Sequence, residues 1–171
     1  MNGSELEPPR QVVPEAIVVL DIVDSVASSD LFGWYAVGRL LNRDLRSLVK
    51  RVAGLSGLQC LKSTGDGYLL TFRDSSAAED AALNALESSF TILSELEARN
   101  RGLPKEQGIH LRFAVHFGEV DVVENDREGP NVAYAFRIEG VSRDSFINAL
   151  DHCDPEILRC ETTFCAVKLL P

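Results

Sequence analysis

The sequence is short of basic residues, and this shortage limits the partners that it can bind. Its 171 residues include 17 Lys and Arg against 26 Asp and Glu, so the formal net charge is -9. A nucleic-acid-binding domain would present a basic face, and an anionic membrane surface would repel a chain of this charge. We therefore expect neither partner. A nucleotide remains compatible with the composition, because a bound divalent cation can reverse the local charge.

Long apolar runs are also missing. No stretch approaches the length that a membrane-spanning helix needs. Residues 1–14 are polar, contain proline and lack the apolar core of a signal peptide. These absences predict a cytoplasmic protein in which residues 1–14 form a flexible lead-in. Residues 15–171 would form one domain, which is long enough to bury a core.

Cysteine is scarce, and a cytoplasmic setting favours reduced thiols over disulfides. A zinc site is the alternative, because several of the cysteines follow His152. Their spacing matches no compact arrangement of two ligand pairs, however. We therefore favour buried or surface thiols over zinc ligands for Cys60, Cys153, Cys160 and Cys165.

The sequence does contain a regular succession of strand and helix patterns. Short β-branched or alternating runs predict strands, and apolar residues at helical spacing predict helices. The expected strands cover Ala16–Leu20, Leu58–Ser63, Tyr68–Phe72, Ile109–His116 and Glu119–Val123, with weak strand-like stretches in the tail 157–170. The expected helices cover Phe32–Val52, Ala77–Arg99 and Val132–Val141. Turns are expected at Gly65–Gly67 and Asn125–Gly129, and a bend at Gly118.

The order of these elements indicates the fold class. Strand, helix, strand, strand, helix, strand is the split βαβ pattern of ferredoxin-like sheets. We therefore predict an α+β domain with an antiparallel or mixed sheet, whose helices pack mainly on one face. The fold by itself says little about function.

Two aspartates occupy positions that this fold would bring together. Asp21 ends the first strand and Asp66 lies in the turn of the hairpin beside it. A carboxylate pair together with triphosphate oxygens suits Mg²⁺, because hard cations prefer oxygen ligands. The simpler interpretation is that Asp66 only forms an Asp-Gly turn, and for these residues taken alone we favour it.

Four sequence blocks shift that balance. An Asp-Ile pair follows an apolar strand, and then come Lys-x-x-Gly-Asp-x-Tyr, His-x-Gly-x-Val and a Gly-x-x-Val segment ending in arginine. In this order they resemble the signatures of the catalytic domain of class III adenylyl and guanylyl cyclases, and residues 15–171 would then be a cyclase homology domain. Each block alone is weak, whereas four in order are specific. The blocks are Val19–Ser25, Leu61–Tyr68, Leu111–Val120 and Gly129–Arg137.

The resemblance implies a reaction, a cofactor and an assembly. Asp21 and Asp66, assisted by the backbone carbonyl of Ile22, would hold two divalent cations, Mg²⁺ or Mn²⁺. The ribose 3′-hydroxyl of a nucleoside triphosphate would attack the α-phosphorus and release pyrophosphate, so the chain would be a phosphorus–oxygen lyase. Each active site would be shared in a homodimer, with the two metal-binding aspartates from one protomer and the other groups from its partner.

The resemblance also implies that ATP is the favoured substrate. Lys62 matches the family's purine-reading lysine, whose ammonium can donate to adenine N1 but is repelled by the protonated N1 of guanine. Asp126 matches the aspartate that accepts from the adenine amino group. Arg137 matches the arginine that stabilises the transition state. Taken singly, a solvated lysine, an aspartate in a turn and a surface partner for Glu139 are the plainer explanations.

The chain departs from the family pattern at Ala133, in the phosphate-cradling turn, at the late phosphate-binding lysine, for which Lys168 is only a weak candidate, and in its shorter tail. Ala133 replaces the transition-state asparagine, and loss of such a group typically costs about 100- to 1000-fold in rate. Asn131 is expected to point to another side of the helix. In the phosphate-cradling turn, where Val23 and Ser25 are expected to contact substrate, Asp24 adds a repelling carboxylate. Three interpretations stay open: a slow cyclase for ATP (or for GTP or a pyrimidine nucleotide), an impaired nucleotide-binding or interaction domain, and an unrelated ferredoxin-like interaction domain.

Overall fold

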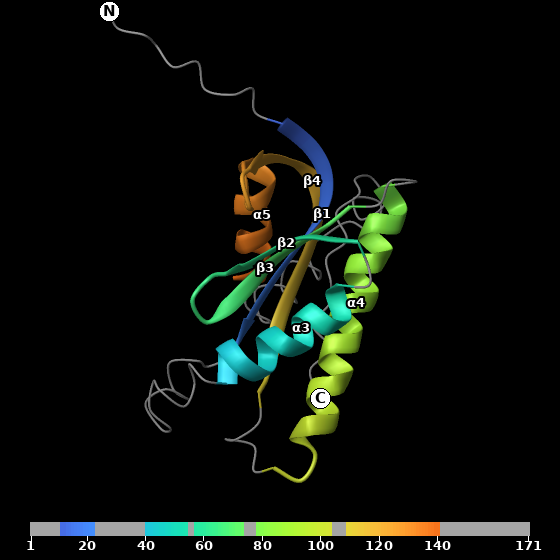
Figure 1. Cartoon of the computed structure of the whole chain (residues 1–171), viewed down its shortest axis with the longest axis vertical. Helices are drawn as coiled ribbons and strands as arrows, with labels where there is room; N and C mark the ends of the chain where they lie inside the picture. The colour runs from blue at the N-terminus through green and yellow to red at the C-terminus, as the bar shows by residue number, and fades with distance from the viewer. Residues whose placement is uncertain (1–10, 23–39, 55–56, 74–77, 104–108, 141–171) are drawn as a thin grey trace, which may run out of the picture.

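The computed structural model describes residues 11–22, 40–54, 57–73, 78–103 and 109–140. Their strands form one antiparallel sheet in the order β2-β3-β1-β4-β5 (Figure 1). The strands are β1 (Gln11–Ile22), β2 (Leu58–Ser63), β3 (Gly67–Phe72), β4 (Leu111–Val123) and β5 (Asp126–Glu128). The helices are a π-helical segment η1 (Leu40–Leu45), α3 (Arg46–Ala53), α4 (Ala78–Asn100) and α5 (Pro130–Glu139). The position of β1 between β3 and β4 confirms the predicted split βαβ arrangement.

The central strand β1 is buried on both faces. Successive side chains of a strand point to opposite sides. Val18 and Leu20 therefore join the core formed with α3 and α4, while Ile17 and Val19 join the core formed with α5. A strand covered on both faces reads as a continuous apolar run, which is why the run from Ala16 onwards was recognisable as a strand.

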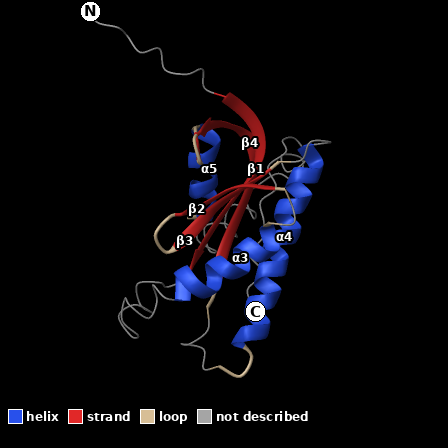
Figure 2. Cartoon of the chain, viewed as in Figure 1, coloured by secondary structure: helices blue, strands red, loops and turns tan. Residues whose placement is uncertain are grey.

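The helices lie on two sides of the sheet (Figure 2). α3 and α4 cover one face together, and α5 packs on the other face against β4 and β1. This agrees with the prediction of helices mainly on one face. Within the described residues, no helix has both the length and the hydropathy to cross a membrane.

Two expectations about strand boundaries are wrong. The lead-in expected over 1–14 is too long, because β1 already begins at Gln11 and pairs there with Val122 of β4. Gly118 does not separate two strands, since β4 continues through it from Leu111 to Val123. The length of β4 explains the early start of β1, because β4 pairs with residues 11–14, which precede the apolar run.

Other expectations need smaller corrections. The turn expected over Asn125–Gly129 is observed at Glu124, where φ is 52°, and Asn125, and it is followed by the short strand β5. Phe90 of α4 is 54% exposed although it is apolar. The helix expected from Phe32 is described from Leu40 onward. The expected tail strands at 157–170 and three of the four cysteines lie outside the described residues.

The two edge strands of the sheet approach each other. β2 and β5 are separated in the sheet by β3, β1 and β4, yet the thiol of Cys60 on β2 donates to the backbone carbonyl of Asn125, just before β5, at 3.3 Å. Sheets twist as strands are added, and here the twist carries the β2–β3 hairpin across β1 and β4 (Figure 1). Residues from opposite edges can therefore form a single site.

Candidate active site

The carboxylates of Asp21 and Asp66 meet at one end of the sheet. Asp21 of β1 lies opposite Gly67, the first residue of β3, so Asp66 comes directly beside it. A Cβ atom at Gly67 would collide with the backbone carbonyl of Leu20, so only glycine lets the hairpin approach this closely. The two carboxylates are near enough to share a hydrogen bond. The structure thus brings together the two residues that the sequence suggested as metal ligands.

Negative charge dominates around this pair. Burial raises the pKa of Asp21 above its usual value, and the charge of Asp66 raises it further. Arg112 of β4 opposes both effects, because its Nη2 atom donates to Asp21 Oδ2 at 2.5 Å. The Nε atom of the same guanidinium group lies 2.8 Å from Glu139 Oε1 at the end of α5. The Arg112 guanidinium group therefore balances the charge of two carboxylates, Asp21 on β1 and Glu139 on α5.

Sequence reasoning missed Arg112, and it gave Glu139 the wrong partner. The plain explanation of Arg137 was an ion pair with Glu139, but Glu139 pairs with Arg112 instead. The partners of Arg112 are far away in the sequence, and Asp21 is 91 positions from it. A charged residue inside an apolar strand pattern was the only signal that could have drawn attention to it.

The Asp21–Asp66 pair fits a divalent cation. Two carboxylates that repel each other are the electrostatic condition that a bound cation relieves. Among the described residues, no group of three or more His, Cys, Asp or Glu side chains could hold a metal. Two carboxylates would leave coordination positions for water, backbone and substrate oxygens, as is common for Mg²⁺. Ile22 follows Asp21 at the end of β1, whereas the adjoining turn residues Val23, Asp24 and Ser25 lie outside the described residues.

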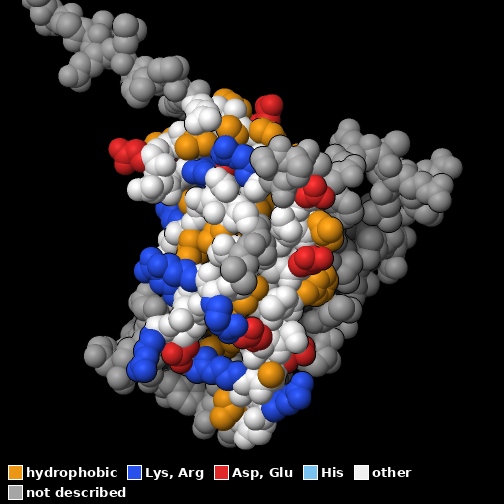
Figure 3. Space-filling view, turned by 45° about the vertical axis from the view of Figure 1, so that its right-hand side comes forward, with side chains coloured by type: hydrophobic (Ala, Val, Ile, Leu, Met, Phe, Trp, Pro, Cys, Tyr) orange, Lys and Arg blue, Asp and Glu red, His pale blue; other side chains and the backbone are white. Residues whose placement is uncertain are grey.

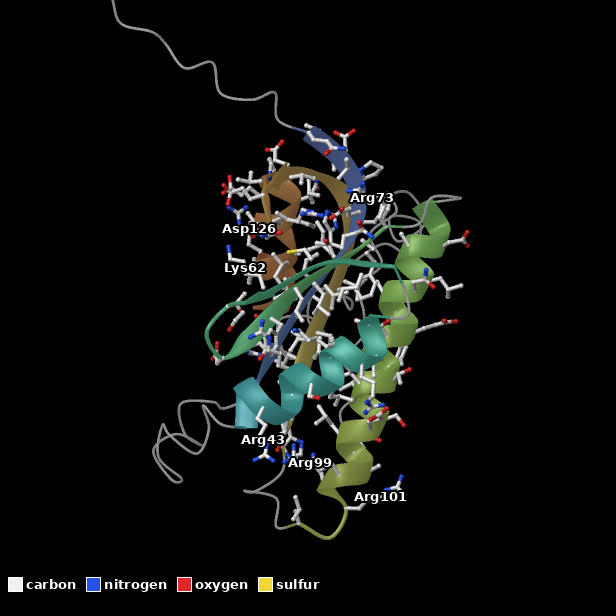
Figure 4. All side chains as sticks on the ribbon, viewed as in Figure 1. Arg43, Lys62, Arg73, Arg99, Arg101 and Asp126 are labelled. Atoms are coloured by element: carbon white, nitrogen blue, oxygen red, sulfur yellow. The ribbon has the colours of Figure 1, made fainter. Side chains whose placement is uncertain are left out.

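A second charged pair joins the two edges of the sheet. Lys62 of β2 and Asp126 of β5 form an ion pair between Nζ and Oδ2 (Figure 4). The other oxygen of Asp126, Oδ1, accepts from the backbone amide of Arg127 at 2.7 Å. Burial alone would raise the pKa of Asp126, but Lys62 and this amide outweigh it and hold the pKa below its usual value. The two residues predicted to read the base therefore lie side by side, and the Lys62 side chain is half exposed.

The exposed side of α5 carries Arg137 and Ala133. The helix begins with Pro130, which suits a first helical turn because it needs no amide donor there. Within the described part of the chain, the guanidinium group of Arg137 has no carboxylate partner. Ala133 presents only a methyl group, so α5 offers one charged donor where the family pattern has an arginine and an asparagine.

Asn131 does not replace the missing asparagine. Its Oδ1 atom lies 2.9 Å from His116 Nε2, and its Nδ2 atom donates to the backbone carbonyl of Glu119 at 2.9 Å. A Cβ atom at Gly118 would overlap the amide group of Asn131, so glycine at this position leaves room for it. Both ends of the amide are engaged, and they fix the start of α5 on β4. In the His-x-Gly block, His116 therefore binds the Asn131 side chain and Gly118 leaves space for it.

The split βαβ sheet with α5 on one face is the catalytic-domain fold of class III adenylyl and guanylyl cyclases, and comparison with known proteins confirms the resemblance. A curated protein of Rhizobium meliloti (strain 1021) named "Putative adenylate cyclase 3" is 29% identical over an alignment of 129 residues, and the match covers 69% of this chain and 20% of that protein. The chain thus spans about a fifth of the length of that relative. No protein-family model matches the chain.

Solved structures show the same fold. The adenylyl cyclase CyaB from P. aeruginosa superposes with a TM-score of 0.67 at 18% identity, covering 85% of this chain and 84% of that one. The catalytic core of a rhodopsin-guanylyl cyclase with converted specificity, in complex with ATPalphaS, gives a TM-score of 0.66 at 20% identity, covering 85% of each chain. At these identities the likeness establishes the fold.

A cavity of about 420 Å³ lies elsewhere, between α3 and α4. Three arginines line it, Arg43, Arg51 and Arg99. Arg51 pairs with Glu95, and Arg99 Nη2 donates to Asp44 Oδ2 at 2.9 Å. Figure 3 likewise shows Lys and Arg side chains interspersed with Asp and Glu on the face it presents. Since the guanidinium groups already have counter-charges and none of the predicted site residues borders the cavity, we do not include it in the site.

Proposed function

We propose that the chain is a nucleotidyl cyclase domain that converts ATP to cyclic AMP and pyrophosphate in a homodimer. The observation that carries the proposal is the meeting of Asp21 and Asp66 at the end of β1, where burial and like charge raise the pKa of Asp21. The fold shared with adenylyl and guanylyl cyclases supports this reaction class. The ATPalphaS bound in one of those structures supports a nucleoside triphosphate as the substrate.

The carboxylates of Asp21 and Asp66, with the carbonyl of Ile22, would hold two divalent cations, Mg²⁺ or Mn²⁺. Such ions, when bound, lower the pKa of the ribose 3′-hydroxyl and neutralise triphosphate charge. The 3′-oxygen forms a bond to the α-phosphorus, the bond from that phosphorus to the bridging oxygen of the β-phosphate breaks, and the hydroxyl proton passes to solvent. Arg112, already beside Asp21, has the planar donor fork that suits phosphate oxygens.

Lys62 and Asp126 provide a donor beside an acceptor. Adenine offers the complementary edge, because its N1 atom accepts and its neighbouring amino group donates. Cytosine presents the same pair at N3 and its amino group, whereas guanine and uracil present a protonated ring nitrogen beside a carbonyl. The pair therefore favours ATP over GTP. Because cytosine offers the same acceptor and donor on a smaller base, comparing CTP with ATP tests whether the size of the base also matters.

The homodimer follows from the groups that the site needs. In the proposed arrangement, one protomer contributes Asp21 and Asp66, and its partner contributes Lys62, Asp126 and Arg137. The exposure of Arg137 on α5, with no carboxylate partner among the described residues, leaves its guanidinium group available to the phosphoryl oxygens of a nucleotide held by Asp21 and Asp66 of the other protomer.

The direct test is to incubate the protein with ATP, GTP, CTP or UTP and Mn²⁺ and to measure cyclic product by chromatography and mass spectrometry. Cyclic AMP should form, and Asp66→Asn should remove it. A matched control is Glu87→Gln on the exposed side of α4, which should leave the rate unchanged. Equal rates for Asp66→Asn and Glu87→Gln would refute the assigned site.

Mixing two inactive variants tests whether the site is shared. Asp66→Asn lacks one metal ligand and Arg137→Ala lacks the phosphoryl donor. In a mixed dimer, one of the two sites would combine both defects and the other would be intact, so mixing should restore about a quarter of the wild-type rate if the protomers exchange at random. No recovery, in a mixture that light scattering shows to be dimeric, would mean that each site lies within one chain.

An impaired, nucleotide-binding domain is the second candidate, and Ala133 is the observation that favours it. Restoring the asparagine with Ala133→Asn should raise the rate by about 10- to 100-fold if the other groups are in place, since one preorganised donor typically contributes this much or more. The measurement is the same product assay at saturating ATP. Nucleotide binding without product in both proteins would establish the impaired domain instead.

A further inference from the structure

The carboxylate of Asp126 is held at both oxygens although it lies on a very short strand. β5 contains three residues and pairs with β4 along one edge of the sheet. So short a ladder gives little support to a side chain that must present an oxygen in a fixed direction. The support has to come from outside the strand.

A buried ion cluster supplies this support. Arg127, the neighbour of Asp126, has a side chain that is 6% exposed, and it faces the fully buried Glu15 of β1. Arg127 Nε donates to Glu15 Oε2 at 2.7 Å, and Nη2 donates to Oε1 at 3.2 Å. Arg73, directly after β3, donates to Glu15 Oε1 at 2.6 Å. Glu15 thereby ties β5 to the centre of the sheet.

Arg127 is bonded to Asp126 at two points as well. Its backbone amide donates to Asp126 Oδ1 at 2.7 Å, and its Nη1 atom donates to the backbone carbonyl of Asp126 at 2.9 Å. The remaining carboxylate oxygen of Asp126 pairs with Lys62. The direction of the Asp126 carboxylate therefore follows the position of Arg127, and Glu15 fixes that position.

A buried ion pair is seldom the most stabilising choice at such a place. Apolar side chains of similar volume are often as stable or more so, because they avoid the cost of removing two charges from water. Apolar side chains, however, cannot fix the orientation of a neighbouring polar group. The guanidinium fork of Arg127 matches the two oxygens of Glu15 in one geometry, and the pair therefore specifies an orientation.

We propose that Glu15 and Arg127 are positioning residues that aim the Asp126 carboxylate, together with Lys62, at the base of a bound nucleotide and so set the base selectivity. This rests on the proposed nucleotide function. Neither positioning residue contacts the base. Loosening the pair should therefore weaken discrimination between bases more than binding of the triphosphate, whose proposed metal-binding residues, Asp21 and Asp66, come from the other protomer of the proposed dimer.

The first measurement compares the dissociation constants of non-hydrolysable ATP and GTP analogues for the full chain with Mg²⁺. In the double variant Glu15→Leu/Arg127→Met, the preference for the ATP analogue should fall by about tenfold, the size expected when a charged hydrogen bond is misdirected. Arg127→Lys should retain part of the preference, because it keeps the charge but loses the fork. The control is Arg51→Met/Glu95→Leu, which removes the exposed α3–α4 ion pair and should leave the preference unchanged.

The second measurement needs no nucleotide. Carbon NMR titration of the Asp126 carboxyl group should show its pKa moving toward the ordinary value in both Arg127 variants, since the contact with Lys62 becomes less direct. Thermal unfolding identifies which variants are folded. If the double variant is unfolded, the measurements on Arg127→Lys test the proposal. A folded variant with wild-type base preference or a wild-type Asp126 titration would overturn the proposal. A wild-type chain that binds no nucleotide would overturn the proposed function, and the titration would then decide the positioning role alone.

Discussion

The two carboxylate sites of this molecule differ in how their charge is balanced. At the end of β1, Arg112 faces both Asp21 and Glu139, and Asp66 adds a further negative charge that helps to raise the pKa of Asp21. At β5, Asp126 pairs with Lys62 and its pKa is held low. The first site is completed by added positive charge, whereas the second is assembled before any ligand binds. In the proposed function, the base-reading pair would thus be preorganised, whereas the site at Asp21 and Asp66 would depend on the cation that binds there.

The largest expected effect of breaking this preorganised region is on stability, through Glu15. Glu15→Gln leaves Arg127 buried without its counter-charge, and such a change typically costs about 3–5 kcal/mol of unfolding free energy. Burial alone would raise the pKa of Glu15, but Arg127 and Arg73 outweigh it and hold the pKa below the ordinary value of 4.5.

The same residue predicts a pH dependence. Since the folded pKa of Glu15 is depressed, its contribution is complete above pH 4.5 and is lost as the pH falls through the folded value. Denaturant unfolding from about pH 7 to about pH 3 should therefore show a shallower acid decline for Glu15→Gln than for the wild type. A variant with wild-type stability and the same acid decline would contradict the buried pairing.

A smaller effect is expected at the other site when Arg112 is removed. Arg112→Met takes away the cation that Asp21 and Glu139 share, which should lower the unfolding free energy by about 1–3 kcal/mol in the presence of a chelator. Added Mn²⁺ should then raise the melting temperature more than it does in the wild type, because the repulsion to be relieved is greater. Arg101→Met, at the exposed end of α4 (Figure 4), is the control and should change neither value.

The smallest expected effect has the opposite sign. Asp66→Asn removes a like charge beside Asp21, so the chelated protein should become more stable by about 0.5 kcal/mol. The same variant should lose most of its response to Mn²⁺. Thermal unfolding with chelator and with Mn²⁺ measures both, and a destabilised variant that still responds to the ion would show that the two carboxylates do not act as a pair.

Local patterns predicted the parts of the fold that carry the proposed ligands. The apolar run into Asp21 marked the central strand, and the Gly65–Gly67 segment marked the hairpin that holds Asp66. These signals lie within a few residues of the side chains that they place. The same locality led to the error at Asp126–Glu128, where a turn pattern concealed β5, because pairing with β4 decides the conformation there.

The charged partners could not be predicted in this way. Glu15 and Arg127 are 112 positions apart, and the sequence around each residue gives no signal that identifies the other as its partner. Glu15 itself gives one hint, since it is an acidic residue at the start of a buried run and is fully buried. A charge in that setting requires a partner, but the identity of the partner depends on how the sheet twists.

Gly67 has a consequence for how the molecule could be inactivated. The space beside Leu20 is too small even for a methyl group, so the spacing of the two acidic ligands is set by main chain against main chain. An alanine there would leave every ligand chemically intact and yet force the hairpin outward. If the proposed function holds, the smallest addition of volume at this position, without any change in charge, would impair ion binding while leaving the Lys62–Asp126 pair in place.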